Sequence, residues 1–99
     1  MPTFAVLYEY TPDQEKTLQN RPAHRKYLQE LLAKNQLVAA GPITDDSGSL
    51  IVYHADDENH VQRIIENDPF HKAGIFVSWQ IKPWRIVFGN RSLLPDGGP

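Results

Sequence analysis

Residues 37–54 have the sequence LVAAGPITDDSGSLIVYH, and this stretch decides the fold. Leu37 to Pro42 and Gly48 to His54 are short runs of the kind that form strands. Between them lies Thr44-Asp45-Asp46-Ser47-Gly48, which is dense in residues that favour turns. We therefore predict a β-hairpin in the middle of the chain.

A helical segment precedes the hairpin. Thr11-Pro12-Asp13-Gln14 has the pattern of a helix start, with Thr11 as the N-cap and proline at the first helical position. Because proline is costly inside a helix, Pro22 predicts a short turn at 12–17 and a new helix from near Asn20. One face of that helix, directed toward the sheet, carries residues at i, i+3 and i+4 spacing: His24, Tyr27, Leu28, Leu31 and Leu32.

A second helix follows the hairpin. Asp56 or Asp57 is its expected N-cap. Its apolar residues point inward: Val61, Ile64 and Ile65. The helix must end by Asp68, because a residue that precedes proline avoids the helical region of backbone conformation.

The first and the last strand complete the pattern. The first runs from Thr3 to Tyr8 and, as a short apolar run, is expected to be a central strand. The last begins after the turn at Gly74, with Ile75, Val77, Trp79 and Ile81 alternating with polar residues and Phe76. Pro83 interrupts the last strand, and Trp84, Ile86 and Phe88 are expected to continue as an edge or partner-facing segment.

The element order is β-α-β-β-α-β, which predicts an α+β fold of the ferredoxin-like type. Two helices would cover one face of a four-stranded antiparallel sheet. We expect one domain over residues 1–89 and a flexible C-terminal tail over 90–99. The other sheet face carries apolar residues, and a 99-residue domain would cover it by pairing with a second copy as a dimeric α+β barrel.

The composition excludes several classes of function. The chain has no cysteine, so disulfides, thiolate catalysis and cysteine-based zinc sites are ruled out. A net charge of −2 with scattered basic residues disfavours a nucleic-acid partner. No apolar run reaches the roughly 20 residues that span a membrane, and no signal peptide is evident, so we expect a cytoplasmic protein. The histidines lack the spacing of a metal site, and we expect neither a metal nor a cofactor.

Two short motifs carry the chemistry. Arg21-Pro22-Ala23-His24 opens the first helix, and Asp68-Pro69-Phe70 follows the second, so that His24 and Asp68 lie 44 positions apart. A histidine oriented by an aspartate is a common general acid–base device near neutral pH. The plainer alternatives are a histidine that packs under the sheet and an aspartate that opens a turn before proline.

Other residues are candidates for holding a substrate. Arg21 could bind an anionic or phenolic oxygen, or could be a solvated residue of the first helical turn. Gly41, Pro42 and Ser49 fit either hairpin geometry or a pocket rim where backbone amides and a hydroxyl meet a ligand. Phe70 is expected in a pocket wall or the core, as are Tyr8 and Trp79.

These motifs resemble the YCII-related (YciI-like) family over roughly residues 3–85. The resemblance rests on five features in order: a first strand ending in Tyr8-Glu9, Arg21-x-x-His24-x-x-Tyr27-Leu28, a strand ending in Gly41-Pro42, Gly48-Ser49, and Asp68-Pro69-Phe70 with Ala73-Gly74. It implies a fold like the dimeric α+β barrels and a dyad of His24 and Asp68. One branch of the family catalyses dehydrochlorination of a chlorinated hydroxyquinol with the dyad in acid–base roles.

Three functions remain open at this point. The first is a small cofactor-independent enzyme that uses His24 and Asp68 for elimination, isomerisation or dehalogenation of a small polar or aromatic metabolite. The second is a regulatory or binding module in which the same pocket holds a small ligand without chemistry. The third is a subunit that docks another protein on its sheet face or strand edge.

Overall fold

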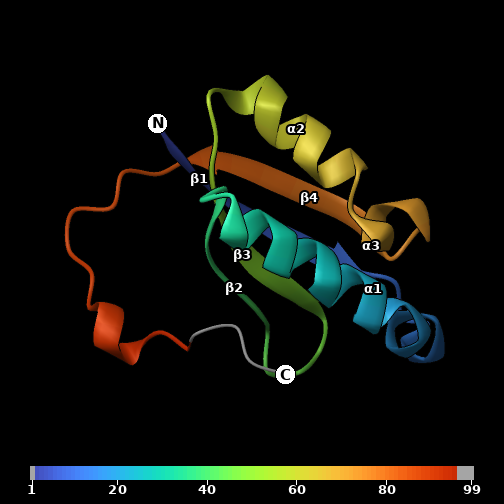
Figure 1. Cartoon of the computed structure of the whole chain (residues 1–99). Helices are drawn as coiled ribbons and strands as arrows, with labels where there is room; N and C mark the ends of the chain where they lie inside the picture. Colours follow the sequence, from blue (N-terminus) through green and yellow to red (C-terminus); the bar gives the residue numbers. More distant parts are fainter. Residues whose placement is uncertain (1, 96–99) are drawn as a thin grey trace.

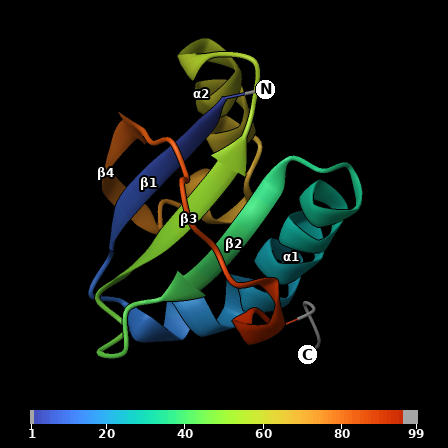
Figure 2. The ribbon, with the colours of Figure 1, turned by 90° about the vertical axis from the view of Figure 1, so that its left-hand side faces the viewer.

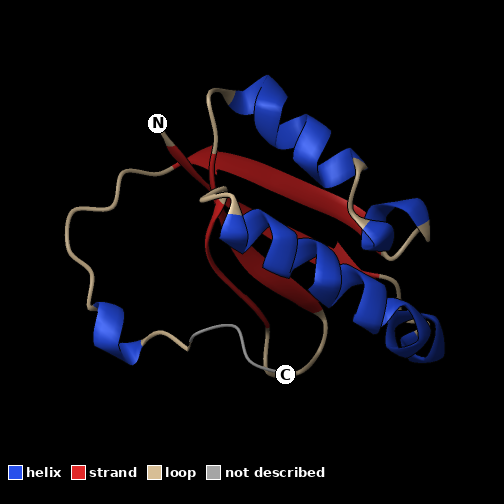
Figure 3. Ribbon diagram, viewed as in Figure 1, coloured by secondary structure: helices blue, strands red, loops and turns tan. Residues whose placement is uncertain are grey.

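The computed structural model describes residues 2–95 and shows a single antiparallel sheet with the two long helices on one face (Figure 1). The four strands are β1 (Thr3–Tyr10), β2 (Leu37–Pro42), β3 (Gly48–His54) and β4 (Phe76–Pro83), in the spatial order β2-β3-β1-β4. The helices are α1 (Gln14–Ala33), α2 (Glu58–Glu66), the short α3 (Pro69–Lys72) and the 3-10 turn η1 (Arg91–Leu93). The predicted ferredoxin-like α+β fold is confirmed, and Figure 3 shows its layers of helices and strands.

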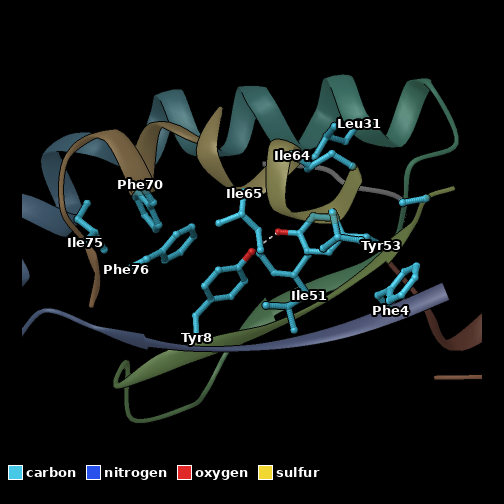
Figure 4. Packing of buried hydrophobic residues seen from close by; sticks show 13 residues of the cluster. Phe4, Tyr8, Leu31, Ile51, Tyr53, Ile64, Ile65, Phe70, Ile75 and Phe76 are labelled. Carbon is cyan, nitrogen blue, oxygen red and sulfur yellow. Dashed lines mark hydrogen bonds between the residues drawn. The ribbon is translucent and has the colours of Figure 1, made fainter. Parts of the chain in front are cut away.

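The core lies between the sheet and the helices because alternate strand residues point to that side. Val6 of β1 opposes Ile51 of β3 on one side and Ile81 of β4 on the other. Figure 4 shows this layer, in which the hydroxyls of Tyr8 and Tyr53 form a buried hydrogen bond of 2.5 Å. The predicted inward residues of α2 are buried as expected: Val61, Ile64 and Ile65.

Helix α1 differs from the prediction, because it is one helix from Gln14 onward rather than a turn and a new helix. Its N-cap is Asp13, whose side chain accepts from the backbone N–H of Lys16 at 3.1 Å. Thr11 lies two residues before this cap, and its hydroxyl accepts from the N–H of Asp13 rather than from a helix N–H. Pro22 lies inside the helix, and both ribbon views show the helix bending between its blue and teal parts (Figure 2). Such a bend is the usual effect of an internal proline.

The start of β4 also differs from the predicted alternation. The pairing of β1 with β4 shifts register between Glu9 and Tyr10, so that Phe76 opposes Tyr10 on the helix side of the sheet. As a result Phe76 is buried and Val77 is exposed, whereas unbroken alternation would put Val77 on the same face as Trp79. A bulge adds one residue to a strand and thereby moves the following side chains to the other face.

The segment after β4 does not continue as a strand. Trp84 is held by Thr3, whose carbonyl accepts from the Trp84 N–H at 3.0 Å and whose hydroxyl donates to the Trp84 carbonyl. Beyond it the chain runs as a loop to η1 (Figure 1). The predicted continuation along the sheet edge is therefore wrong, whereas the partner-facing alternative stays a prediction. Part of the predicted tail, residues 96–99, lies outside the described residues. Within residues 2–95 no helix has the length and apolarity to cross a membrane.

The hairpin is confirmed, and its second strand begins at a tightly packed glycine. A Cβ added to Gly48 would lie 1.9 Å from the carbonyl oxygen of Tyr8 on the neighbouring strand. Since a backbone atom cannot move aside cheaply, we expect Gly48→Ala to lower the free energy of unfolding by at least about 1–3 kcal/mol.

Urea denaturation would measure this loss, with Gly41→Ala as the matched control. A Cβ at Gly41 has no atom within 4 Å, and that variant should unfold at nearly the wild-type midpoint. Equal midpoints for the two variants would contradict the close approach of β1 to residue 48.

Candidate functional site

A cavity of about 550 Å³ lies between α1 and β2. It exists because β2 is poor in large side chains. The residues that oppose Ile51 and Ser49 of β3, and so face the helix, are Ala40 and Pro42. Small side chains there cannot fill the space under α1, and the gap is a pocket of the size that holds small organic ligands.

His24 and Asp68 meet at the inner wall of this pocket. The Nδ1 atom of His24 lies 2.7 Å from Oδ1 of Asp68. The imidazole is buried on α1, one heptad from the buried residues Thr17 and Leu31, and Asp68 is fully buried. Seven residues make about two helical turns, so this spacing keeps His24 on the face of α1 that meets the sheet.

The ring of His24 is oriented from two sides. It stacks on Phe70 with ring centroids 3.8 Å apart and planes 2° apart. Asp68 Oδ1 also accepts from the backbone N–H of Phe70 at 2.8 Å, so one carboxylate oxygen binds both the imidazole and the first turn of α3. Because a carboxylate only accepts hydrogen bonds, this pattern assigns the proton to Nδ1 and leaves Nε2 free for a group in the pocket.

Asp68 is brought to His24 by a short helix that the sequence reading missed. Asp68 is the N-cap of α3, and Pro69 follows it at the first helical position. An aspartate cap followed by proline is a recognised helix start, and this signal was present in the sequence. The second oxygen, Oδ2, is buried and makes no hydrogen bond within the described part of the chain.

The structure brings the other predicted site residues together around the same pocket. Five of them line it with His24: Arg21, Gly41, Pro42, Ser49 and Phe70. The Ser49 hydroxyl is buried and lies close to the hydroxyl of Tyr10, with which it interacts. Asp68 is not part of the lining, because it lies behind His24.

Several polar residues of the pocket were not predicted from the sequence, among them Tyr10 and Arg25. Tyr10 lines it from the end of β1, and Arg25 lines it from α1, one turn after Arg21. The sequence carried a signal for both. Residues four apart share a helix face, and Tyr10 continues the alternation by which Val6 and Tyr8 face the helices.

Four tyrosines surround the dyad. Burial raises the pKa of each, and the charge of the nearby Asp68 adds to the rise: Tyr8, Tyr10, Tyr27 and Tyr53. Burial raises the pKa of Tyr27 to about 12. The hydroxyl of Tyr27 donates to the carbonyl of Ile64 at 2.7 Å, which joins α1 to α2 beside the site.

We expect the free energy of unfolding to fall as the pH rises above about 10. The unfolded chain releases tyrosine protons near pH 10, whereas the native state keeps Tyr27 protonated until its raised pKa of about 12. Over that window the native state binds more protons than the unfolded state, so stability falls with rising pH. Urea titrations from pH 8 to 11.5, with tyrosinate absorbance followed in parallel, would measure it. A free energy of unfolding independent of pH over this range would contradict the buried tyrosine cluster.

The remaining histidines do not join the site. His71 packs its ring edge against Trp79 with centroids 5.5 Å apart, and His60 lies beside Asp56 on α2. In the part of the chain that the structure describes, no three His, Cys, Asp or Glu residues are grouped so that they could hold a metal ion.

Comparison with known proteins gives the chain its relatives. The YCII-related domain matches residues 2–85. The chain is 31% identical to Protein YciI of Escherichia coli O6:H1 over 84 residues, which is 75% of this chain and 86% of that protein. It is 30% identical to an uncharacterised protein of Haemophilus influenzae, with the same coverage of both chains.

A solved structure shares the fold. The 5-chloro-2-hydroxyhydroquinone dehydrochlorinase of Burkholderia phenoliruptrix, solved in complex with 2,5-dihydroxybenzoquinone, superposes with a TM-score of 0.74 at 30% identity. The match covers 84% of this chain and 93% of that one. With the domain match over residues 2–85, these likenesses show that the chain belongs to the YCII-related domain family.

Proposed function

We propose that the pocket is the active site of a small acid–base enzyme, with His24 as the general acid–base and Asp68 as its orienting carboxylate. The observation that carries this proposal is a buried imidazole, fixed by a 2.7 Å contact at Nδ1, on the wall of a 550 Å³ pocket. Fixing one ring nitrogen directs the other at a substrate and stabilises the imidazolium that forms when it accepts a proton.

The reaction class that fits best is elimination, and dehydrochlorination is its form in the related enzyme. In the loss of HCl, Nε2 of His24 takes one proton from the substrate. The C–Cl bond breaks, and chloride leaves with the bonding electrons. Substrate and product differ by HCl alone, so the step is neutral in redox terms and needs no cofactor. The imidazolium returns its proton to water.

The other lining residues would position the substrate. Arg21 supplies guanidinium N–H donors for a phenolate or carboxylate oxygen. The Ser49 hydroxyl, beside that of Tyr10 in the lining, can hydrogen-bond a second oxygen. Gly41 and Pro42 shape the rim, and Phe70 supports the imidazole from below.

We also propose that the chain works as a homodimer. Leu7 and Leu50 oppose each other in the β1–β3 ladder on the sheet face away from the helices, and they are 49% and 41% exposed. Pairing two such faces would bury them. Light scattering after size exclusion should give twice the chain mass, and a monomer at micromolar concentration would contradict the pairing.

Turnover of 5-chloro-2-hydroxyhydroquinone tests the function. We expect the wild type to release chloride, followed with a chloride electrode and by quinone absorbance. Arg21→Gln should raise KM about tenfold, because one charge-assisted contact to a substrate oxygen is lost.

Lys26→Gln is the matched control for this variant. It removes the same charge from an exposed position on α1 that does not line the pocket, and KM should stay at the wild-type value. Binding of 2,5-dihydroxybenzoquinone without chloride release would favour the binding module over the dehydrochlorinase.

A further inference from the structure

The segment after β4 lies mostly beyond the family match, which ends at residue 85, and its far end returns to the pocket. Leu94 and Pro95 line the cavity together with residues of α1 and β2. Figure 1 shows the segment leaving β4 as a long loop, with η1 (red) standing apart from the ribbon of α1. This chain therefore builds one wall of its pocket from residues outside the matched domain.

The cavity lining that includes Leu94 also contains other apolar side chains that are partly exposed to solvent. Leu18 and Leu32 of α1 line the pocket and are still among the exposed large apolar residues of the chain, as is Leu94 itself. Leu18 and Leu32 lie 14 residues apart on α1, about 21 Å along the helix, so one small ligand does not reach both, and Leu94 adds apolar surface from a distant segment. Apolar lining of this kind suits an apolar part of a ligand.

The same cavity is cationic. Arg21 and Arg25 lie one turn apart on α1, and neither guanidinium forms an ion pair with any carboxylate of the described residues. The acidic residue in the lining is Asp46 of the exposed hairpin turn. Unpaired guanidiniums in a half-enclosed site are suited to bind carboxylate or phenolate oxygens.

We propose that the site takes an organic anion with an apolar body, and that Leu94 of the C-terminal segment is a specificity-determining residue that contacts this body. The proposal rests on the proposed function in one respect, that the pocket is the ligand site. It goes further in naming the ligand class and in giving the C-terminal segment a role in selecting it.

The test compares two probes, benzoate and 4-tert-butylbenzoate, by NMR titration of the full chain. The wild type should bind the larger anion at least tenfold more tightly, because its alkyl group contacts Leu94. Leu94→Ala should bind 4-tert-butylbenzoate at least threefold more weakly than the wild type does, while its affinity for benzoate stays unchanged. A chain that ends at Asn90 should also lose the preference for 4-tert-butylbenzoate over benzoate.

Leu93→Ala is the matched control. Leu93 is the same residue type one position earlier, it is 78% exposed, and it does not line the cavity. This variant should bind both probes as the wild type does. Both side chains lie on the surface of the C-terminal segment, so neither substitution should unfold the domain. The neutral isostere 4-tert-butylbenzyl alcohol should bind the wild type at least tenfold more weakly than the carboxylate.

Three results would overturn the proposal: equal effects of Leu93→Ala and Leu94→Ala, no preference for the larger anion, or equal binding of the alcohol. These readouts are affinities and do not depend on turnover. Failure of the wild type to release chloride, with the affinity differences present, would defeat the proposed reaction and leave the ligand class standing. Turnover that requires His24, with no difference between the leucine variants, would support the proposed reaction and overturn the proposed role of Leu94.

Discussion

His24→Asn is expected to lower kcat by about 10²–10⁴-fold, the usual contribution of a positioned acid–base group. The asparagine side-chain N–H₂ group can replace Nδ1 as a donor to Asp68, so the buried carboxylate keeps its partner. An amide cannot accept a proton near neutral pH, and therefore the chemistry is lost while the fold is kept. Steady-state kinetics with chloride release would measure the loss, and circular dichroism would check the fold.

Asparagine is a better test than alanine at this position. His24→Ala would leave Asp68 buried without the imidazole, and removal of one partner of a buried pair destabilises by about 3–5 kcal/mol. A lost activity could then reflect unfolding. His71→Asn is the matched control, since His71 packs against Trp79 and does not line the pocket. A wild-type kcat in His24→Asn would remove His24 from the mechanism.

Asp68→Ala is expected to lower the free energy of unfolding by about 3–5 kcal/mol. The substitution takes the acceptor from two buried donors, the Nδ1–H of His24 and the backbone N–H of Phe70. It also removes the N-cap of α3. A domain of this size has about 5–15 kcal/mol of stability in total, so the loss would be a large fraction of it. Urea denaturation at neutral pH would measure it.

Asp57→Ala separates the cap from the pair. Asp57 is the N-cap of α2 and accepts from the His60 N–H at 2.8 Å, but it is exposed and holds no buried imidazole. Loss of an exposed cap alone costs about 1 kcal/mol. If Asp57→Ala and Asp68→Ala lost equal stability, the contact with His24 would contribute nothing to folding.

Asp68→Asn tests the electrostatic role. The asparagine oxygen can still accept from the Phe70 N–H, so most of the stability should remain. Without the negative charge, the imidazolium that forms during turnover loses its stabilisation, and kcat should fall by at least about 10²-fold. Retained turnover would assign Asp68 a purely structural role.

The element order was predictable because it depends on local patterns. The turn residues between Leu37–Pro42 and Gly48–His54 and the Asp57 cap each act within a few residues. The burial of His24 followed from its place on the apolar stripe of α1. Short-range backbone preferences and the helical period govern these features, and both are readable from the chain.

Local patterns failed where distant packing opposed them. Pro22 predicted a break in α1, but the helix continues and bends because its buried face is held by the sheet and by α3. Unbroken alternation in β4 would put Val77 on the same face as Trp79 and Ile81, but the register shift beside Tyr10 turned Phe76 inward. The pairing partner of each strand residue, which the strand's own sequence does not contain, decided the second case.

The sequence by itself determined the ferredoxin-like order, the hairpin, and the two motifs that hold His24 and Asp68. Only the tertiary structure decided that His24 Nδ1 and Asp68 Oδ1, 44 positions apart in sequence, lie 2.7 Å from each other. It also decided that α1 and the small side chains of β2 leave a cavity beside this pair, and that Leu94 lines the cavity. The reason is physical. Propensity and capping act within one or two helical turns, whereas a cavity depends on how well side chains from separate elements fill the space between them.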